Sequence, residues 1–162
     1  MCSELIHDIT GHEISPAALL EAQFLQVARQ NMADLPFYRR HIPVRACGFR
    51  VYEDQWFGAM LTPWMMELMV LPGPGQQWPR RPVGERIGLE FPTGNLAFRV
   101  GEMAGLHYLA CSLMSPLDAH LSAEQALALA ENSVTLALSL PVREEPPAVN
   151  ASRRALLRGK VA

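Results

Sequence analysis

The stretch LEFPTGNLAFRVGEMAGLHYLACSLM, residues 89–114, predicts three consecutive β-strands. Apolar residues lead into a turn signal at residues 92–94 and then alternate with polar ones over residues 96–100. A second turn at residues 102–105 precedes a third extended run, residues 106–114. Strands that follow one another through tight turns pair antiparallel, so the stretch predicts an antiparallel β-meander.

A further hairpin is predicted before this stretch. From Val44, apolar and polar residues alternate through Tyr52, Glu53 and Asp54 supply turn chemistry, and the alternation resumes at Trp56. The predicted sheet therefore takes strands from both halves of the chain.

Two helices are predicted on either side of the sheet strands. The first begins at Ser15 and Pro16, continues to about Met32 and carries an apolar stripe of Leu20, Phe24, Val27 and Ala28. The second begins at Ser122, which forms a capping-box pattern with Gln125, ends before Pro141, and carries a stripe of Leu127, Ala130, Val134 and Leu138. We therefore expect an α+β fold: an antiparallel β-meander sheet with an N-terminal and a C-terminal helix packed on it, in the simplest arrangement on one face.

The length and composition predict one folded domain between two tails. A chain of 162 residues that is 49% hydrophobic is long enough to bury one core. The polar residues 1–14 are expected to form a flexible lead, residues 15–143 the single α+β domain, and residues 144–162 a linker and C-terminal tail.

Charge and cysteine usage exclude several classes of function. A net charge of −2 gives no electrostatic basis for binding nucleic acid. The cysteines at positions 2, 47 and 111 form no C-x-x-C pair, which excludes a disulfide framework and the common zinc and iron-sulfur spacings. No apolar run reaches the ~20 residues of a membrane span, and no export leader begins the chain, so we expect a cytoplasmic protein.

The stretch TPWMMELMVLPGPGQQWP, residues 62–79, is the best candidate for a contact surface. Thr62 and Pro63 predict the start of a helical turn over residues 64–67, followed by a strand at 68–71 and a break at 72–75. Methionine and tryptophan adapt to and anchor apolar partners, but they also fill cores, so the stretch is either contact surface or core.

Other combinations of reactive residues do not indicate a catalytic or metal site. His7, Asp8, His12 and Glu13 match no closed metal-ligand spacing, and solvated tail residues are the default interpretation. Cys111 near His107 and His120 is interpreted as a buried, inert thiol rather than a nucleophile with its base. The motifs of phosphate-binding loops, serine hydrolases and zinc proteases are not present in the sequence. The residues alone therefore predict a cytosolic α+β binding domain without a cofactor.

The tail segment SRRALLRG, residues 152–159, has two interpretations. Its leucines dock on the domain while its arginines remain hydrated, or Arg153 and Arg154 belong to a partner-binding surface.

Five blocks in this order resemble the HybE-type nickel-iron hydrogenase assembly chaperones. They are residues 62–79, IGLEFPTGNLAFRVGE at 87–102, YLACSLMSPL at 108–117, SLPV at 139–142 and RRALLRG at 153–159. None encodes chemistry, and together they cover most of the chain from about Ser15 onward.

The resemblance implies a cytoplasmic, non-enzymatic maturation factor that binds hydrogenase precursors before twin-arginine export. The expected partners are a small-subunit precursor carrying the twin-arginine signal, in some systems a large-subunit precursor, and other maturation proteins. A thiol-dependent redox or oxygen-protective protein using Cys47 or Cys111, and a structural subunit retained in the mature enzyme, are the alternatives.

The resemblance also favours contact over core for the 62–79 stretch, because a chaperone recognises apolar surface on an immature partner. Acidic side chains at Glu67, Glu85, Glu90 and Glu102 are candidates to complement a twin-arginine pair. The predicted partner-binding residues are Trp64, Met65, Met66, Met69, Pro72, Trp78, Pro79, Arg153 and Arg154.

Overall fold

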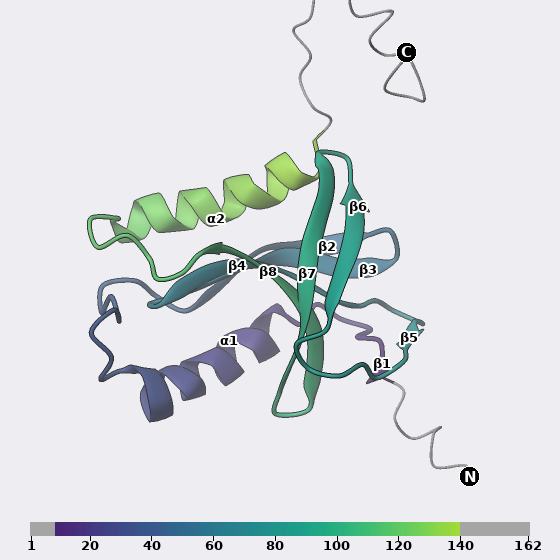
Figure 1. The fold of residues 1–162 in the computed structure, drawn as a ribbon, viewed down its shortest axis with the longest axis horizontal. Helices are drawn as coiled ribbons and strands as arrows, with labels where there is room; N and C mark the ends of the chain where they lie inside the picture. Colours follow the sequence, from purple (N-terminus) through teal and green to yellow (C-terminus); the bar gives the residue numbers. More distant parts are fainter. Residues whose placement is uncertain (1–8, 140–162) are drawn as a thin grey trace, which may run out of the picture.

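The computed structural model describes residues 9–139 of the chain, which form an α+β fold (Figure 1). Its helices and strands are β1 (Ile9–Thr10), α1 (Ala17–Val27) with a π-helical turn (Ala28–Met32), β2 (Arg45–Tyr52), β3 (Gln55–Thr62), β4 (Met65–Pro72), β5 (Gln77–Trp78), β6 (Arg86–Phe91), β7 (Gly94–Met103), β8 (Leu106–Met114) and α2 (Ala123–Ala137). The predicted fold class, with its antiparallel sheet and its N-terminal and C-terminal helices, is confirmed.

The main sheet consists of two antiparallel meanders joined at their last strands. Its six strands lie in the order β2-β3-β4-β8-β7-β6. Strands β2, β3 and β4 follow one another, as do β6, β7 and β8, and β4 pairs antiparallel with β8. Strand β4 is therefore an interior strand, while β2 and β6 form the edges.

Thr62 begins a tight hairpin turn rather than a helix. Thr62 and Met65 are paired across β3 and β4 with two residues between them. The Thr62 hydroxyl oxygen accepts hydrogen bonds from the backbone N–H groups of Trp64 (3.4 Å) and Met65 (3.2 Å). The same threonine chemistry that caps a helix thus closes a β-turn, and the predicted helical turn at residues 64–67 is wrong.

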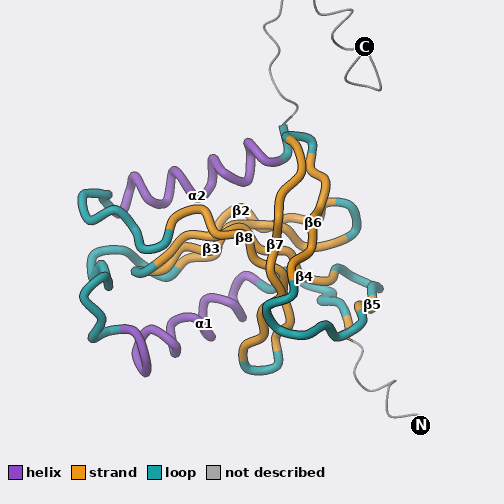
Figure 2. Tube along the Cα trace, in the orientation of Figure 1, coloured by secondary structure: helices purple, strands orange, loops and turns teal. Residues whose placement is uncertain are grey.

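The two helices lie on opposite faces of the sheet, not on one face as expected. In Figures 1 and 2 the sheet passes between α1 and α2. Side chains alternate between the faces of a strand, and the two buried clusters divide the residues of β4 accordingly: Leu68 packs in the cluster with α2, and Met69 in the cluster with α1. An interior strand covered on both faces explains why β4 is a nearly continuous apolar run.

The core on the α2 face draws on every strand of the main sheet. Helix α2 begins with the predicted capping box, in which the Ser122 hydroxyl accepts from Gln125 N–H and the Gln125 side chain accepts from Ser122 N–H. Its buried side chains pack with an aromatic group in which Phe91 lies 4.8 Å from Phe57 and 5.8 Å from Phe98 between ring centroids. Apolar residues of β6 and β7 therefore belong to this core.

The core on the α1 face covers only part of the sheet. Leu20 and Phe24 of α1 pack with Met60 and Met69 of the neighbouring strands β3 and β4. This cluster contains no residue of β6, and Met103 at the far end of β7 packs only at its margin. The α1 face of β6 and most of β7 is consequently open.

Residues 9–14 lie against the folded chain, which differs from the flexible lead predicted for residues 1–14. Ile9 and Thr10 of β1 pair with Trp78 and Gln77 of β5, and the carbonyl oxygen of His12 accepts from the indole N–H of Trp56 at 2.9 Å. The remainder of that lead and the predicted tail from residue 144 lie outside the described residues. The proposed domain boundaries stay predictions.

Candidate functional site

Most of the predicted contact residues in the 62–79 stretch are core residues. Trp64 is 9% exposed and stacks against Tyr38 at 6.2 Å, beneath α1. The other buried residues of the set are Met65, Met66, Met69 and Pro72. A buried side chain offers almost no area to a partner, so the burial of these five residues argues against the predicted contact. The physical reason is that β4 lies between two helices.

Trp78 and Pro79 belong to the part of the stretch that remains accessible. Pro79 is exposed, and Trp78 is partly buried at the margin of the α2-face core. The indole N–H of Trp78 donates to the side-chain oxygen of Gln76 at 3.2 Å, which fixes the ring orientation. Their role in binding a partner stays a prediction.

A cavity of about 190 Å³, the Trp78 pocket, lies beside this indole. Its walls come from β3, β5, β6, β8 and the segment after β5, which includes Arg81, and are mainly apolar. The residues that define it are Gln55, Trp78, Pro79, Leu89, His107 and Leu109. A cavity of this kind suits one inserted side chain of a partner.

His107 gives the Trp78 pocket a polar wall that the sequence did not indicate. The imidazole is 1% exposed, its Nε2 accepts from the Arg81 N–H at 3.5 Å, and its Nδ1 has no hydrogen-bond partner among the described residues. Burial lowers the pKa of His107, opposed by the carboxylate of Glu102, whose Oε1 lies 3.9 Å from Nδ1. A neutral ring that accepts at Nε2 carries its proton on Nδ1, so the imidazole retains an unused donor.

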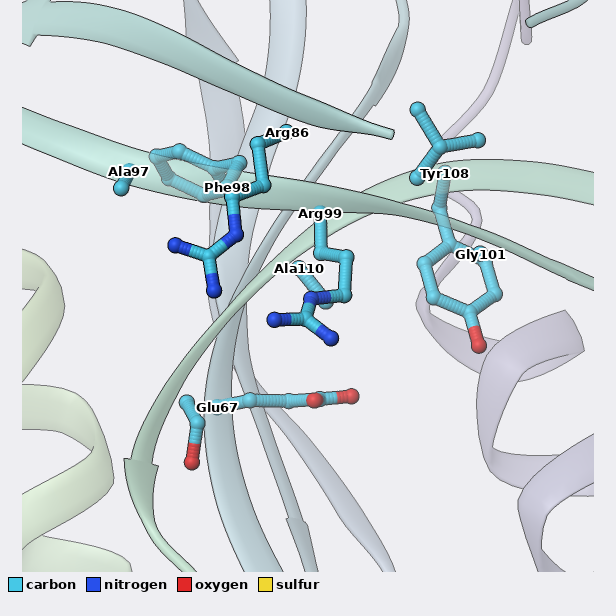
Figure 3. A pocket seen from close by; sticks show the side chains of 10 residues that line it. Glu67, Arg86, Ala97, Phe98, Arg99, Gly101, Tyr108 and Ala110 are labelled. Carbon is cyan, nitrogen blue, oxygen red and sulfur yellow. The ribbon is translucent and has the colours of Figure 1, made fainter. Parts of the chain in front are cut away.

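A second hollow, the Glu67 groove, lies on the open part of the α1 face and has a volume of about 450 Å³ (Figure 3). Its defining residues are Glu67 of β4, Arg86 of β6, Arg99 and Gly101 of β7, and Tyr108 and Ser112 of β8. The carboxyl of Glu67 and the guanidinium groups of Arg86 and Arg99 project to the same side of the sheet in Figure 3.

Glu67 occupies an unusual place for a carboxylic acid. It is largely buried, and this burial raises its pKa from 4.5 to about 7. Neither arginine of the groove forms an ion pair with it within 4 Å. A substantial fraction of Glu67 is therefore protonated at neutral pH, which makes it a poor fixed anion for a twin-arginine pair.

Arg86 and Arg99 were not among the predicted site residues, although the sequence holds a signal for them. A hairpin closed by Pro92 and Thr93 pairs Phe91 with Gly94 and fixes the register of β6 and β7. That register places Arg86 opposite Arg99.

The outer side of α1 is a further exposed surface that the sequence analysis did not identify. Ile14 is 80% exposed and Leu19 44% exposed, with Ala18, Ala22 and Leu25 beside them. The sequence signal for this surface is the low number of charged residues in α1. Glu21 is the only one, and its carboxylate accepts a hydrogen bond from the Ala46 N–H of β2 at 2.8 Å.

The two described thiols lie in surroundings that oppose redox chemistry. Burial is the main cause that raises the pKa of Cys47 to about 11, with a further contribution from Glu131. Burial also raises the pKa of Cys111. A thiol is reactive as its thiolate, so both environments disfavour the thiol-dependent alternative.

The remaining candidate features concern metals, membranes and the tail. Residues 9–139 contain no group of three or more His, Cys, Asp or Glu side chains arranged to hold a metal ion. None of the helices in the described part of the chain is long and apolar enough to cross a membrane. The predicted contacts at Arg153 and Arg154, and the His7 and Asp8 part of the metal hypothesis, lie outside the described residues.

Comparison with known proteins gives a consistent result along nearly the whole chain. Residues 15–159 match the family described as "[NiFe]-hydrogenase assembly, chaperone, HybE". The hydrogenase-2 operon protein HybE of Escherichia coli K12 is 43% identical over 96% of each chain, and the hydrogenase expression/formation protein HupJ of Bradyrhizobium diazoefficiens is 31% identical over 87% of this chain and 86% of its own. The solution structure of HybE from Escherichia coli superimposes with a TM-score of 0.70, covering 96% of both chains.

Proposed function

The chain belongs to the HybE family of nickel-iron hydrogenase assembly chaperones, and we propose that it binds the precursor of a hydrogenase small subunit carrying a twin-arginine signal. It acts in the cytoplasm, before export, and catalyses no reaction on its partner. A large-subunit precursor and other maturation proteins are further partners of the same kind. The observation that carries the proposal is family membership combined with the accessible Trp78 pocket.

The Trp78 pocket supports the proposal by its chemistry. A chaperone must hold a segment that is accessible in the immature partner and unavailable after assembly. The Trp78 ring, Leu89 and Leu109 offer apolar contact, and His107 adds a polar residue to the lining. We propose that Trp78 and Pro79 contact one anchoring side chain of the precursor.

The tail extends the proposed contact surface. Arg153 and Arg154 lie within the residues matched by the family. Because they are cationic, they serve acidic surface of the precursor rather than its twin-arginine signal.

The substitution Trp78→Ala tests this contact. Loss of an aromatic anchor commonly costs about 2 kcal/mol of binding free energy, which corresponds to roughly 30-fold weaker capture of the precursor. The fold is expected to persist, because Trp78 lies at the margin of the core rather than within it. Capture by tagged full-length protein and melting temperature are measured on the same preparations.

Leu136→Ala provides the matched control. Leu136 is 64% exposed on α2, outside the Trp78 pocket. We expect its removal to leave capture unchanged. Unchanged capture by folded Trp78→Ala protein removes Trp78 from the contact surface, and capture that declines only in step with melting assigns Trp78 a purely structural role.

A further inference from the structure

Arg86 and Arg99 form a pair of like charges with no ion-pair partner among residues 9–139. They stand directly opposite each other on β6 and β7, both side chains are exposed, and like charges in this position destabilise a sheet. The neighbouring arginines are compensated, since Arg80 pairs with Glu102 and Arg81 with Glu85. Within residues 9–139, no carboxylate forms an ion pair with Arg86 or Arg99.

Glu67 does not neutralise this pair. Its carboxyl lines the same groove but forms no ion pair with either guanidinium, and its pKa is raised to about 7 by burial. Two permanent positive charges therefore face one acid that is only partly ionised at neutral pH. The groove has an excess of positive charge, although the whole chain carries a net charge of −2.

The floor of the groove consists partly of small side chains. Ala110 and Ser112 of β8 and Ala97 of β7 present small side chains. Tyr108 lies over Gly101, its partner across β7 and β8, where a Cβ atom would come within 2.5 Å of the ring. The tyrosine is thus held down against the sheet and its hydroxyl remains at the edge of the groove (Figure 3).

We propose that the Glu67 groove binds an acidic, extended segment of the partner polypeptide, with a carboxylate held between the guanidinium groups of Arg86 and Arg99. Guanidinium groups bind carboxylates through paired, charge-assisted hydrogen bonds, and the carboxylate relieves the repulsion between the two arginines. This inference rests on the proposed function, in which the segment belongs to the hydrogenase precursor. It assigns to Glu67 a role opposite to that of a binding site for a twin-arginine pair.

Glu67 makes the binding dependent on pH. Protonated Glu67 donates a hydrogen bond to an incoming carboxylate, whereas ionised Glu67 repels it. The charged and titratable groups around it are Arg86 and Arg99 from β6 and β7, and Tyr108 from β8, whose pKa is raised to about 12 by burial and by Glu67 itself. Cys111 of β8 also has a raised pKa. No residue of α1 lines the groove, and on β3 the uncharged side chain of Met60 belongs to the residue paired with Glu67. Among the groups lining the groove, Glu67 is therefore the one that titrates between pH 6 and pH 8.

An NMR titration of the full-length protein tests the inference. The probe is an unlabelled, capped peptide of alternating glutamate and threonine, and the matched peptide carries glutamine in place of glutamate. We expect the glutamate peptide to shift amide resonances of β6, β7 and β8 and the glutamine peptide to bind at least about tenfold more weakly. Raising the pH from 6 to 8 should weaken binding of the glutamate peptide by up to about tenfold, and Glu67→Gln should remove this pH dependence.

A double substitution and its control locate the site. Arg86→Gln with Arg99→Gln should weaken binding of the glutamate peptide at least about tenfold. Arg45→Gln with Arg50→Gln makes the same change in charge on β2, the opposite edge of the sheet, and should leave binding unchanged. Equal binding by both double variants, or resonance shifts confined to another surface, would overturn the proposal.

Capture of the hydrogenase precursor separates this inference from the proposed function. If wild-type protein captures the precursor, the groove variant captures it equally well and the glutamate peptide does not bind, the groove inference fails while the chaperone function stands. If wild-type protein captures no precursor but the glutamate peptide binds in the groove, the proposed function fails and the preference for acidic segments stands.

Discussion

The two faces of the sheet are built from the same strands but serve different purposes. On the α2 face, β6 and β7 contribute Phe91, Phe98 and Val100 to a closed apolar core. On the α1 face the same two strands present Arg86 and Arg99 to solvent, because α1 covers the other half of the sheet. Open surface is therefore found on the part of the sheet that α1 does not cover, rather than along the methionine-rich strand β4.

Glu67 lies at the boundary between the covered and the open parts of the α1 face. Its neighbours along that side of β4 are Met65 and Met69, both buried against α1. A carboxyl group at this position costs stability when ionised, and the groove gives it access to solvent and to a ligand. The comparison of the two faces is consequently tested by substitutions that differ only in the face they alter.

The largest difference is expected between two adjacent residues of β7. Phe98 is 1% exposed on the α2 face, and Phe98→Ala should lower the free energy of unfolding by about 3–5 kcal/mol. Arg99 points to the open face, and Arg99→Ala should change the free energy of unfolding by less than about 0.5 kcal/mol. Urea denaturation of both variants measures the contrast, and equal losses would show that the α1 face of β7 is also part of the core.

The next effect concerns the pH dependence of stability. Because the folded-state pKa of Glu67 is about 7 and its usual value is 4.5, ionisation in the folded state opposes folding, and stability falls as pH rises from about 5 to 8. The expected loss is on the order of 2–3 kcal/mol.

The matched variant for this effect is Glu67→Gln, which should not show that loss. The lowered pKa values of His12 and His107 act in the opposite direction, reducing stability at acid pH, but they cancel in the difference between the two proteins. Parallel curves of unfolding free energy for wild type and Glu67→Gln between pH 5 and pH 8 would contradict the burial of Glu67 described here.

Alanine substitution of two glycines on the open face should change stability in different ways, by smaller amounts. A Cβ at Gly101 would meet the Tyr108 ring at 2.5 Å, so Gly101→Ala should displace the ring and lower stability by about 1 kcal/mol. A Cβ at Gly88 of β6 would meet nothing within 4 Å, and Gly88→Ala should be neutral or stabilising by about 0.5 kcal/mol. Thermal melting compares them, and an equal destabilisation would mean that the ring does not depend on Gly101.

The smallest effect is expected from the thiols. Replacing Cys47 and Cys111 together with alanine should change stability by no more than about 1 kcal/mol, because both are small side chains, and should leave hydrogenase maturation intact. The measurement is hydrogenase activity in cells that make the double variant. A stable variant that still captures precursor but yields inactive hydrogenase specifically in air would restore the redox alternative.

The strands of the two predicted hairpins, the strand after them and both helices could be predicted because each depends on local pattern. Alternation gave the hairpins around Glu53 and around Pro92, and the Ser122 capping box is present as predicted. The helix at Ser15 is also present, with its first helical residue at Ala17. These features require only contacts between residues close in sequence.

The layer arrangement could not be predicted from the same pattern. An apolar stripe shows that a helix buries one side, but not which face of the sheet it covers, and the pairing of β4 with β8 joins strands that are distant in sequence. For the same reason the methionines at 65, 66 and 69 suited both core and contact surface until β4 was placed inside the sheet. The Glu67 groove likewise depends on the juxtaposition of β4 with β8 and β7.

The state of the captured hydrogenase subunit tests the proposed chaperone function most directly. Tagged protein is purified from cells that make hydrogenase, and the small subunit that co-purifies is examined by mass spectrometry. The account predicts a small-subunit precursor whose twin-arginine signal is still uncleaved. Capture of mature small subunit alone would contradict it and would identify the chain as a structural subunit retained in the finished enzyme.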